Sequence, residues 1–236
     1  MLNILLTIAA RGGSKGVKKK NIKLLAGRPL ISYTIAQAKR WGKAKHIVVT
    51  TDSLEIAKAA KKFGADVPFL RPKNLATSTA SKVDVIKHAL IASENYYKQK
   101  FDVVVDLDVT SPIRTVKDLD NCLKLFLRKK PNTLFSVVTA KKNPYFNMVE
   151  ENNGKVVLSK QLPGRIVRRQ DAPKVYSMNA SIYFYDRKYL LTAKVPSPIN
   201  NRCCMYEMDE LSSVDIDSEL DFKYIDLLVK EKLVRL

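Results

Sequence analysis

The stretch that decides the fold is LLTIAARGGSKG, residues 5–16, in which an apolar run passes directly into a glycine-rich turn. The run 5–10 is short and bounded by glycine, which is typical of a buried strand. The turn combines glycines and a serine with two cations: Arg11, Gly12, Gly13, Ser14, Lys15 and Gly16. Glycines let backbone N–H groups approach phosphate oxygens closely, and cations balance the phosphate charge. The stretch therefore predicts a strand leading into a triphosphate cradle; a plain turn with incidental lysines is the alternative.

Outward from this stretch, strand-like and helix-like segments alternate. The strand-like runs are 5–10, 46–51, 67–70, 101–108 and 134–140, and the helix-like segments are 29–41, 52–63, 82–98 and 115–130. Asp52 with Glu55, and Thr115 with Asp118, predict capping boxes at two of the helix starts. The βαβ alternation predicts a parallel sheet covered by helices. Ligands of such sheets bind beyond the carboxyl ends of the strands, where the opening turn lies.

The pattern changes from about residue 141. NMVEENNGKVVLS, residues 147–159, predicts a hairpin that turns at Asn-Asn-Gly, and an irregular stretch follows it. We expect one domain over residues 1–236, with an approximate excursion over 141–180 that serves dimerisation and sugar binding. The protein is therefore expected to form a homodimer.

The charge balance favours anionic partners. Lys and Arg total 42 against 23 Asp and Glu, a net charge of +19, and the cations are spread along the chain without a separate basic tail. A lysine-rich, solvated surface explains the charge equally well. Nucleic-acid binding requires basic and aromatic residues gathered on one face, and the nearest candidates, YYKQKF (96–101) and FLRKK (126–130), lie at predicted helix ends. Phosphorylated small molecules are therefore preferred to nucleic acid as partners.

Cysteine content and hydropathy indicate the compartment. Cys122, Cys203 and Cys204 form neither a CxxC pair nor an even-numbered framework, as in a reduced chain. The apolar stretch 4–10 is too short to span a membrane and lacks the basic flank of a signal peptide. We expect a cytoplasmic location and no membrane partner.

A triphosphate usually brings a metal, and two acidic pairs could hold one. Asp215 and Asp217 stand two residues apart on an extended segment, so both carboxylates face one side. Asp106 and Asp108 share a strand face in the same way. One or two carboxylates completed by phosphate oxygens suit Mg²⁺. The residues alone leave either pair possible, and a helix-capping role is the alternative for Asp217.

Six stretches, in order from residue 4 to about 225, together resemble the CMP-sialic acid synthetases (acylneuraminate cytidylyltransferases). They are IAARGGSKGVKKKNIKLLAGRPLI (8–31), VVTTDS (48–53), FLRPKNLATSTAS (69–81), DVTSPIR (108–114), NASIYF (179–184) and SVDIDSELDF (213–222). The resemblance implies a three-layer α/β fold of the nucleotide-diphospho-sugar transferase type, Rossmann-like, with a mixed sheet and a protruding dimerisation segment. It implies transfer of CMP from CTP to the C2 hydroxyl of a nine-carbon 2-keto sugar acid, with release of pyrophosphate and a requirement for Mg²⁺.

The resemblance also implies residue roles. The expected CTP-binding residues are Arg11, Gly12, Gly13, Ser14, Lys15, Lys20, Asn21, Arg71 and Ser81. Arg11 and Lys15 match residues that support the transition state. Asp215 and Asp217 match the metal-binding aspartates of the family, which favours this pair over Asp106 and Asp108. Asp217 or a metal-bound water is expected to accept the proton of the attacking hydroxyl.

The sugar-binding positions depart from the family pattern. The expected set is Asp108, Arg169, Asn179 and Tyr183. Many sialic acid enzymes have glutamine where this chain has Asp108, and arginine where it has Ser177. Both exchanges change the charge offered to the sugar. The pattern is similar to the branch that activates legionaminic acid. We therefore expect a legionaminic acid-like substrate, with N-acetylneuraminic acid or the eight-carbon acid KDO as alternatives.

Overall fold

A six-stranded mixed sheet forms the centre of the computed structural model, which describes residues 2–14, 16–164 and 166–236. The strand order is β10-β6-β9-β5-β1-β4. The strands are β1 (Ile4–Ala9), β4 (His46–Thr50), β5 (Val103–Leu107), β6 (Thr133–Thr139), β9 (Tyr176–Asp186) and β10 (Cys203–Glu207). Only β9 among these six runs antiparallel to its neighbours, β5 and β6. The mixed sheet expected from the resemblance is confirmed, whereas the βαβ alternation alone predicted a parallel one.

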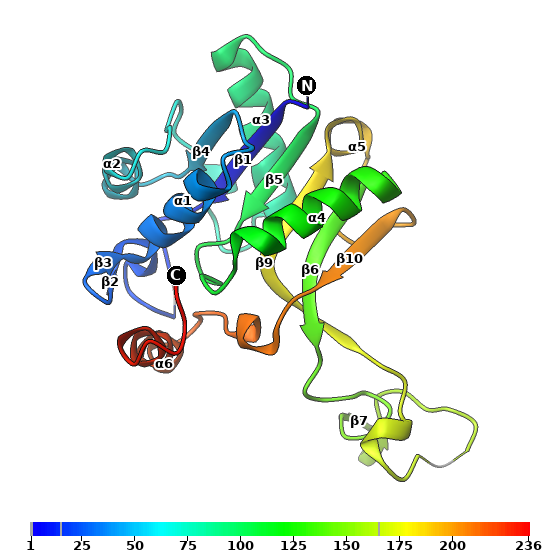
Figure 1. Cartoon of the computed structure of the whole chain (residues 1–236). Helices are drawn as coiled ribbons and strands as arrows, with labels where there is room; N and C mark the ends of the chain where they lie inside the picture. The colour runs from blue at the N-terminus through cyan, green and yellow to red at the C-terminus, as the bar shows by residue number, and fades with distance from the viewer. Residues whose placement is uncertain (1, 15, 165) are drawn as a thin grey trace.

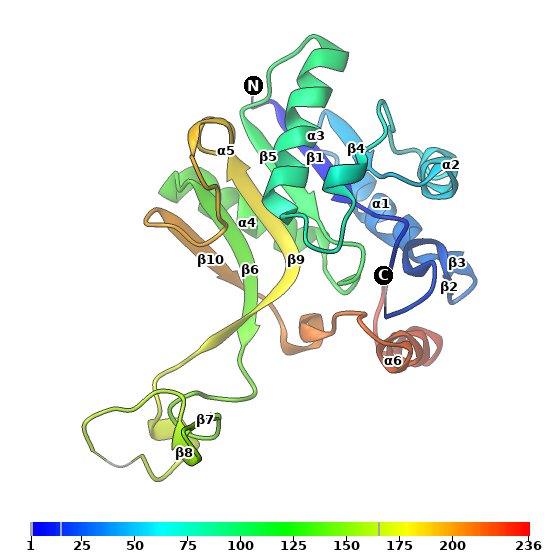
Figure 2. The same cartoon turned by 180° about the vertical axis from the view of Figure 1, so that it is seen from behind.

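Helices cover both faces of the sheet, which gives the three layers expected. They are α1 (Leu30–Trp41), α2 (Leu54–Lys62), α3 (Lys82–Tyr97), α4 (Val116–Lys129), α5 (Arg187–Thr192) and α6 (Glu219–Lys230). Figure 1 shows α1 and α4 in front of the sheet, and Figure 2 shows α3 on the opposite face. Strand β1 is buried on both sides, because Leu6 and Ile8 join the core with Ile31 while Leu5 packs with Val48.

Short elements connect these layers. The 3₁₀ turns are η1 (Lys20–Ile22), η2 (Lys73–Leu75), η3 (Arg169–Asp171) and η4 (Glu210–Ser213), and β2 (Leu24–Leu25) pairs with β3 (Arg28–Pro29). The predicted strand 67–70 is wrong: this stretch forms no strand, and an isolated parallel bridge joins Val48 to Asp66 just before it. Pro68 explains the difference, because proline has no N–H to donate to a ladder.

The helix starts confirm one predicted capping box and correct the other. Thr115 and Asp118 form a reciprocal capping box at α4. At α2, however, the cap is Ser53, whose hydroxyl accepts from the Ile56 N–H at 3.4 Å. The carboxylate of Asp52 accepts instead from the Gly12 N–H at 2.8 Å. Asp52 therefore fixes the opening turn rather than the helix.

The segment between β6 and β9 leaves the sheet and forms a protruding lobe (Figures 1 and 2). It contains the predicted hairpin, in which β7 (Val149–Asn152) pairs with β8 (Lys155–Leu158). Asn153 and Gly154 at its turn have φ values of 53° and 75°, as a tight hairpin turn requires. None of the helices in the described ranges is both long enough and apolar enough to cross a bilayer.

Candidate active site

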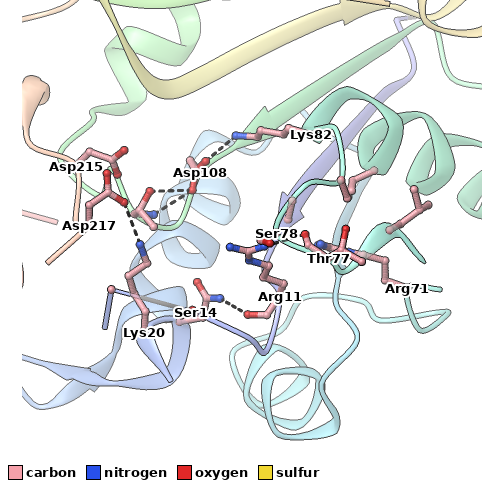
Figure 3. A pocket seen from close by; sticks show the side chains of 17 residues that line it. Arg11, Ser14, Lys20, Arg71, Thr77, Ser78, Lys82, Asp108, Asp215 and Asp217 are labelled. Carbon is pink, nitrogen blue, oxygen red and sulfur yellow. Dashed lines mark hydrogen bonds and ion pairs between the residues drawn. The ribbon is translucent and has the colours of Figure 1, made fainter. Parts of the chain in front are cut away.

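A cavity of about 450 Å³ lies beyond the carboxyl ends of β1 and β5, where ligands of α/β sheets bind (Figure 3). It is lined by Ala9, Arg11, Ser14, Gly16, Lys20, Asn21, Arg71, Leu75, Thr77, Ser78, Ala80, Lys82, Val85, Asp108, Thr110, Asp215 and Asp217. The opening turn and the acidic couplet of Asp215 and Asp217 thus meet in one cavity, although about 200 residues separate them in the sequence.

Hydrogen bonds hold the opening turn in place at the end of β1. The Arg11 guanidinium donates to the Thr77 carbonyl at 2.8 Å, and Asn21 donates to the Arg11 carbonyl at 2.9 Å. The Ser14 N–H donates to the Gly12 carbonyl at 3.1 Å. Because the Gly12 N–H is engaged by Asp52, it is turned away from any ligand. The Arg11 side chain is therefore anchored before a ligand binds.

Gly16 brings the opening turn against the acidic couplet. A Cβ on Gly16 would lie 1.8 Å from the backbone oxygen of Asp217. No side chain can occupy that space unless one of the two backbones moves. Gly13, in contrast, has nothing within 4 Å of its would-be Cβ. Close backbone approach thus explains the glycine at 16 and not the one at 13.

Lys20 links the two halves of the cavity. Its ammonium donates to the Ile216 carbonyl and lies 3.4 Å from the Asp217 carboxylate (Figure 3). The Lys20 side chain is 13% exposed, whereas that of Asp217 is 81% exposed. The Asp217 carboxylate is therefore free to reorient toward a cation, while Lys20 is held against the backbone.

The donor set of the acidic couplet fits magnesium. Burial raises the pKa of Asp215, and the negative charges of Asp108 and Asp217 raise it further. A bound cation would relieve this repulsion. In the described ranges no third histidine, cysteine or acidic side chain completes a metal-binding cluster here. Two carboxylates completed by phosphate oxygens are a usual magnesium–nucleotide site, so the residues present fit the metal.

Sequence reasoning missed Lys82, which lines the cavity beside Asp108. The Lys82 ammonium lies 2.6 Å from the Asp108 carboxylate and 3.1 Å from that of Asp106. Burial alone would raise the pKa of Asp108, but the Lys82 charge and hydrogen bond outweigh it, and that pKa is lowered. The sequence did contain a signal for Lys82: a lysine in the first turn of a helix is unfavourable because its charge opposes the helix dipole, so its presence there suggests another role.

Several predicted residues lie outside this cavity. Gly12, Gly13 and Ser81 adjoin it without lining it, and Arg169 lines a separate cavity at the base of the protruding lobe. Asn179 is buried, and its side chain bonds the Ser136 hydroxyl at 2.6 Å and the Ser212 carbonyl at 3.1 Å. These bonds occupy the Asn179 amide within the fold.

Tyr183, predicted to bind the sugar, does not line the cavity. Tyr183 is buried beneath Lys82, whose ammonium lies 4.7 Å from the ring centroid. Lys15, predicted to bind the triphosphate, lies outside the described residues. Thr77, Ser78 and Thr110 line the cavity and were not singled out from the sequence.

Comparisons with known proteins indicate the family of this chain. The cytidylyltransferase family model matches residues 5–233. The post-translational flagellin modification protein B of Campylobacter coli is 46% identical over 232 residues, which cover 98% of this chain and 97% of that protein. The CMP-N,N'-diacetyllegionaminic acid synthase of Campylobacter jejuni is 45% identical, with coverage of 98% and 97%.

A solved structure extends the comparison to the fold. The CMP:2-keto-3-deoxy-manno-octonic acid synthetase complexed with CTP superposes with a TM-score of 0.72, covering 98% of this chain and 99% of that one at 16% identity. The fold is therefore of the nucleotide-sugar transferase type that the sequence predicted. The family match spans nearly the whole chain, and the similarity to relatives is high over the same length. The chain therefore belongs to the cytidylyltransferase family.

Proposed function

We propose that this protein transfers CMP from CTP to the C2 hydroxyl of a legionaminic acid-like nine-carbon sugar acid and releases pyrophosphate. One observation carries the proposal: the cationic opening turn and the acidic couplet line a single cavity. The similarity to a protein named CMP-N,N'-diacetyllegionaminic acid synthase supports the sugar class.

The triphosphate would lie between the opening turn and Lys20. The Arg11 and Lys20 side chains are already anchored to backbone carbonyls, of Thr77 and Ile216 respectively. Preorganised cations stabilise the charge that develops in phosphoryl transfer without a further cost of reorganisation. Lys15 is proposed to act with Arg11. Little covalent work falls to the protein, and positioning and charge neutralisation dominate.

The nucleoside would occupy the part of the cavity lined by Asn21 and Arg71. The Arg71 guanidinium is buried and donates to Thr50, which fixes its plane at the end of β4. Ser81 stands at the N-cap position of the adjoining helix α3, without a side-chain capping bond, and is the proposed ribose contact. A fixed guanidinium and amide can recognise a base by hydrogen bonds without a change in the fold.

Asp215 and Asp217 would hold magnesium. When bound, the metal neutralises phosphate charge and lowers the pKa of the attacking hydroxyl. Asp217 is proposed as the proton acceptor, because its exposed carboxylate faces the cavity beside Lys20. Asp215 is the more fixed member of the pair, because its carboxylate accepts from the Ser111 hydroxyl at 3.3 Å.

The sugar acid would enter beside Asp108. Because Lys82 pairs with Asp108, the aspartate adds no isolated negative charge at this position. Tyr183 lies beneath Lys82 at this end of the site. Asn179 is proposed to support the site from within the fold, and Arg169 is proposed to contact the sugar from the base of the lobe. We also propose a homodimer that works in the cytoplasm; the described cysteines are free, as that compartment favours.

A pyrophosphate-release assay tests the proposal. Legionaminic acid, N-acetylneuraminic acid and KDO are each supplied with CTP, UTP or ATP, in the presence of Mg²⁺ or of a chelator. We expect release with CTP and legionaminic acid, and its loss on chelation. Strong preference for N-acetylneuraminic acid would overturn the sugar assignment, and turnover with UTP or ATP would overturn the nucleotide assignment.

Variants of the acidic couplet test the residue roles. Asp215→Asn and Asp217→Asn should each lower kcat by about 10²-fold or more, as losses of transition-state charge stabilisation do. Asp84→Asn serves as a control, because Asp84 is an exposed residue of α3 outside the cavity. Near-normal kcat in both couplet variants would remove the couplet from the mechanism.

A further inference from the structure

A carboxylate is buried in the centre of the sheet. Asp106 on β5 stands in register with Thr7 on β1 and Tyr183 on β9, so the three side chains form a row across the middle strands. Asp106 is fully buried, and one of its oxygens accepts from the Thr7 hydroxyl at 2.7 Å. Its other oxygen has the Lys82 ammonium 3.1 Å away. A buried charge of this kind requires a compensating partner.

Lys82 is that partner, and it also reaches the cavity. It is the first residue of α3, and its ammonium lies between the carboxylates of Asp106 and Asp108 and over the ring of Tyr183. About a third of its side chain, 33%, remains exposed. An ammonium has three donors, and Lys82 donates one of them to the Asp108 carboxylate. The Lys82 side chain also lines the cavity, so a ligand there can contact it.

Stability does not account for this arrangement. A buried ion pair gains little over apolar residues of similar volume, because both charges must lose their hydration. A cation in the first turn of α3 is also unfavourable toward the helix dipole. Strongly perturbed charges that line a cleft are therefore candidates for a functional role.

The charges around Lys82 indicate its ligand. Figure 3 shows Lys82 and Asp108 on one side of the cavity, opposite Lys20 and Ser14. Asp215 and Asp217 lie on a neighbouring wall, so an anionic substrate approaching the Lys82–Asp108 pair would also meet two further carboxylates. Arg11 and Lys20 belong to the opening turn and η1, where the triphosphate is proposed to bind. An anion that enters beside Asp108 needs a cation there, and Lys82 supplies it.

We propose that Lys82 binds the carboxylate of the sugar acid, with Asp106 as the buried counter-ion that holds the ammonium in place. This inference rests on the proposed function, since it assigns one contact of the acceptor substrate. It makes Lys82 a specificity-determining residue that selects sugar acids over neutral sugars. Asp106 acts only through Lys82 and touches no substrate.

Three variants test the contact. Lys82→Met and Lys82→Gln remove the charge, Lys82→Arg keeps it, and Lys117→Met is the matched control, an exposed lysine in the first turn of α4. Loss of a charged hydrogen bond predicts a rise of roughly 10–100-fold in the KM for the sugar acid in both neutral variants. The KM for CTP should stay within about threefold, below the effect of one such bond. Lys82→Arg should recover part of the loss.

The methyl ester of the sugar acid provides a second measurement. Wild-type enzyme should prefer the acid to its neutral ester, and Lys82→Met should lose most of that preference. A rise in the KM for CTP instead of the KM for the sugar acid would assign Lys82 to the nucleotide and overturn the proposal. An unchanged preference of Lys82→Met for the acid over the ester would also overturn it. Should Lys82→Met fail to fold by thermal melting, the acid-to-ester preference of Lys82→Gln and Lys82→Arg decides. Absence of turnover in wild-type enzyme would instead contradict the proposed function itself.

Discussion

The contact between Gly16 and Asp217 joins two segments that are distant in the sequence. A Cβ at position 16 would lie 1.8 Å from a backbone oxygen, which cannot move as a flexible side chain can. The opening turn and the acidic couplet therefore approach each other only because residue 16 has no side chain. The absence of a Cβ at residue 16 thus lets the proposed phosphate and metal sites lie side by side.

Replacing Gly16 with alanine should lower both stability and activity. Forcing a methyl group into this contact should cost about 1–3 kcal/mol, a fall in Tm of roughly 2–10 °C for a chain of this size. A shift of the couplet by about 1 Å should lower kcat/KM on the order of 10²-fold. Calorimetry and the pyrophosphate assay measure the two effects. Gly13→Ala is the control for Tm, because its Cβ meets nothing within 4 Å; equal Tm values would contradict the contact.

At the scale of elements, two similar capping boxes have different neighbours. Thr115 with Asp118 begins α4, and Ser218 with Asp221 begins α6. The Asp221 carboxylate also accepts from the Asp217 N–H at 3.1 Å. The start of α6 therefore fixes the backbone of the acidic couplet, whereas at the start of α4 the Asp118 carboxylate accepts from the Tyr206 hydroxyl of β10, at 3.1 Å, away from the cavity.

Alanine at each cap separates stability from function. Thr115→Ala and Ser218→Ala should each lower the free energy of unfolding by about 1 kcal/mol, since each removes one N-cap. Only Ser218→Ala should also raise the Mg²⁺ concentration needed for half-maximal activity, because the Ser218 hydroxyl holds the Asp221 carboxylate that accepts from the Asp217 N–H. Urea denaturation and magnesium titration measure the two effects. The same magnesium requirement in both variants would mean that the cap does not position the couplet.

Helices α3 and α5 are joined by an ion pair that depends on pH. Glu94 accepts from Arg187 at 2.7 and 2.9 Å and from the Phe101 N–H at 3.1 Å. Burial alone would raise the pKa of Glu94, but the Arg187 and Phe101 hydrogen bonds outweigh it, and the pKa is lowered. A carboxylate whose folded-state pKa lies below its unfolded value stabilises the fold above the unfolded value. That stabilisation is lost as pH falls through the folded-state pKa.

Glu94→Gln should therefore be less stable than wild type at neutral pH, and the difference should shrink as the solution becomes acidic. Urea denaturation at pH 7, 5, 4 and 3 measures the difference, with Glu150→Gln on the exposed strand β7 as the control. A difference that stays constant over this range would show that the Glu94 charge does not contribute.

At the scale of the whole molecule, the protruding lobe exposes an apolar face. On the hairpin, Val149 and Leu158 are cross-strand partners, and Val156 follows on the same face, where Glu151 is its own cross-strand partner. Val149 is 61% and Val156 68% exposed. A two-stranded hairpin is only marginally stable alone in water, so its apolar face requires another surface. A second copy of the chain is the proposed cover, as the homodimer proposed above requires.

A charge on that face should separate the dimer. Val156→Glu should shift the protein toward monomer at micromolar concentration, because the carboxylate would be buried without a partner. Lys155→Glu is the control, since residue 155 points to the opposite face of the hairpin. Light scattering after size-exclusion chromatography measures the mass. A dimer that survives Val156→Glu would place the interface elsewhere.

Local patterns in the sequence predicted much of this molecule. The apolar run of β1, the capping box of α4 and the turn of the β7–β8 hairpin each depend on residues within a few positions of one another. The wrong expectation for Asp52 arose where a short-range pattern competed with a partner 40 residues away, the Gly12 N–H. Short-range rules cannot rank such distant partners.

The alternating elements, the cationic turn after the first strand and the acidic couplet can all be predicted from the sequence, because each is a local pattern of residue types. The antiparallel direction of β9, the contact of Gly16 with Asp217 and the place of Lys82 between Asp106 and Asp108 became visible only in the folded chain. The tertiary structure also separates Arg169 and Asn179 from the main cavity. These features depend on contacts between segments far apart in the chain, which form only when the sheet brings the strand ends together.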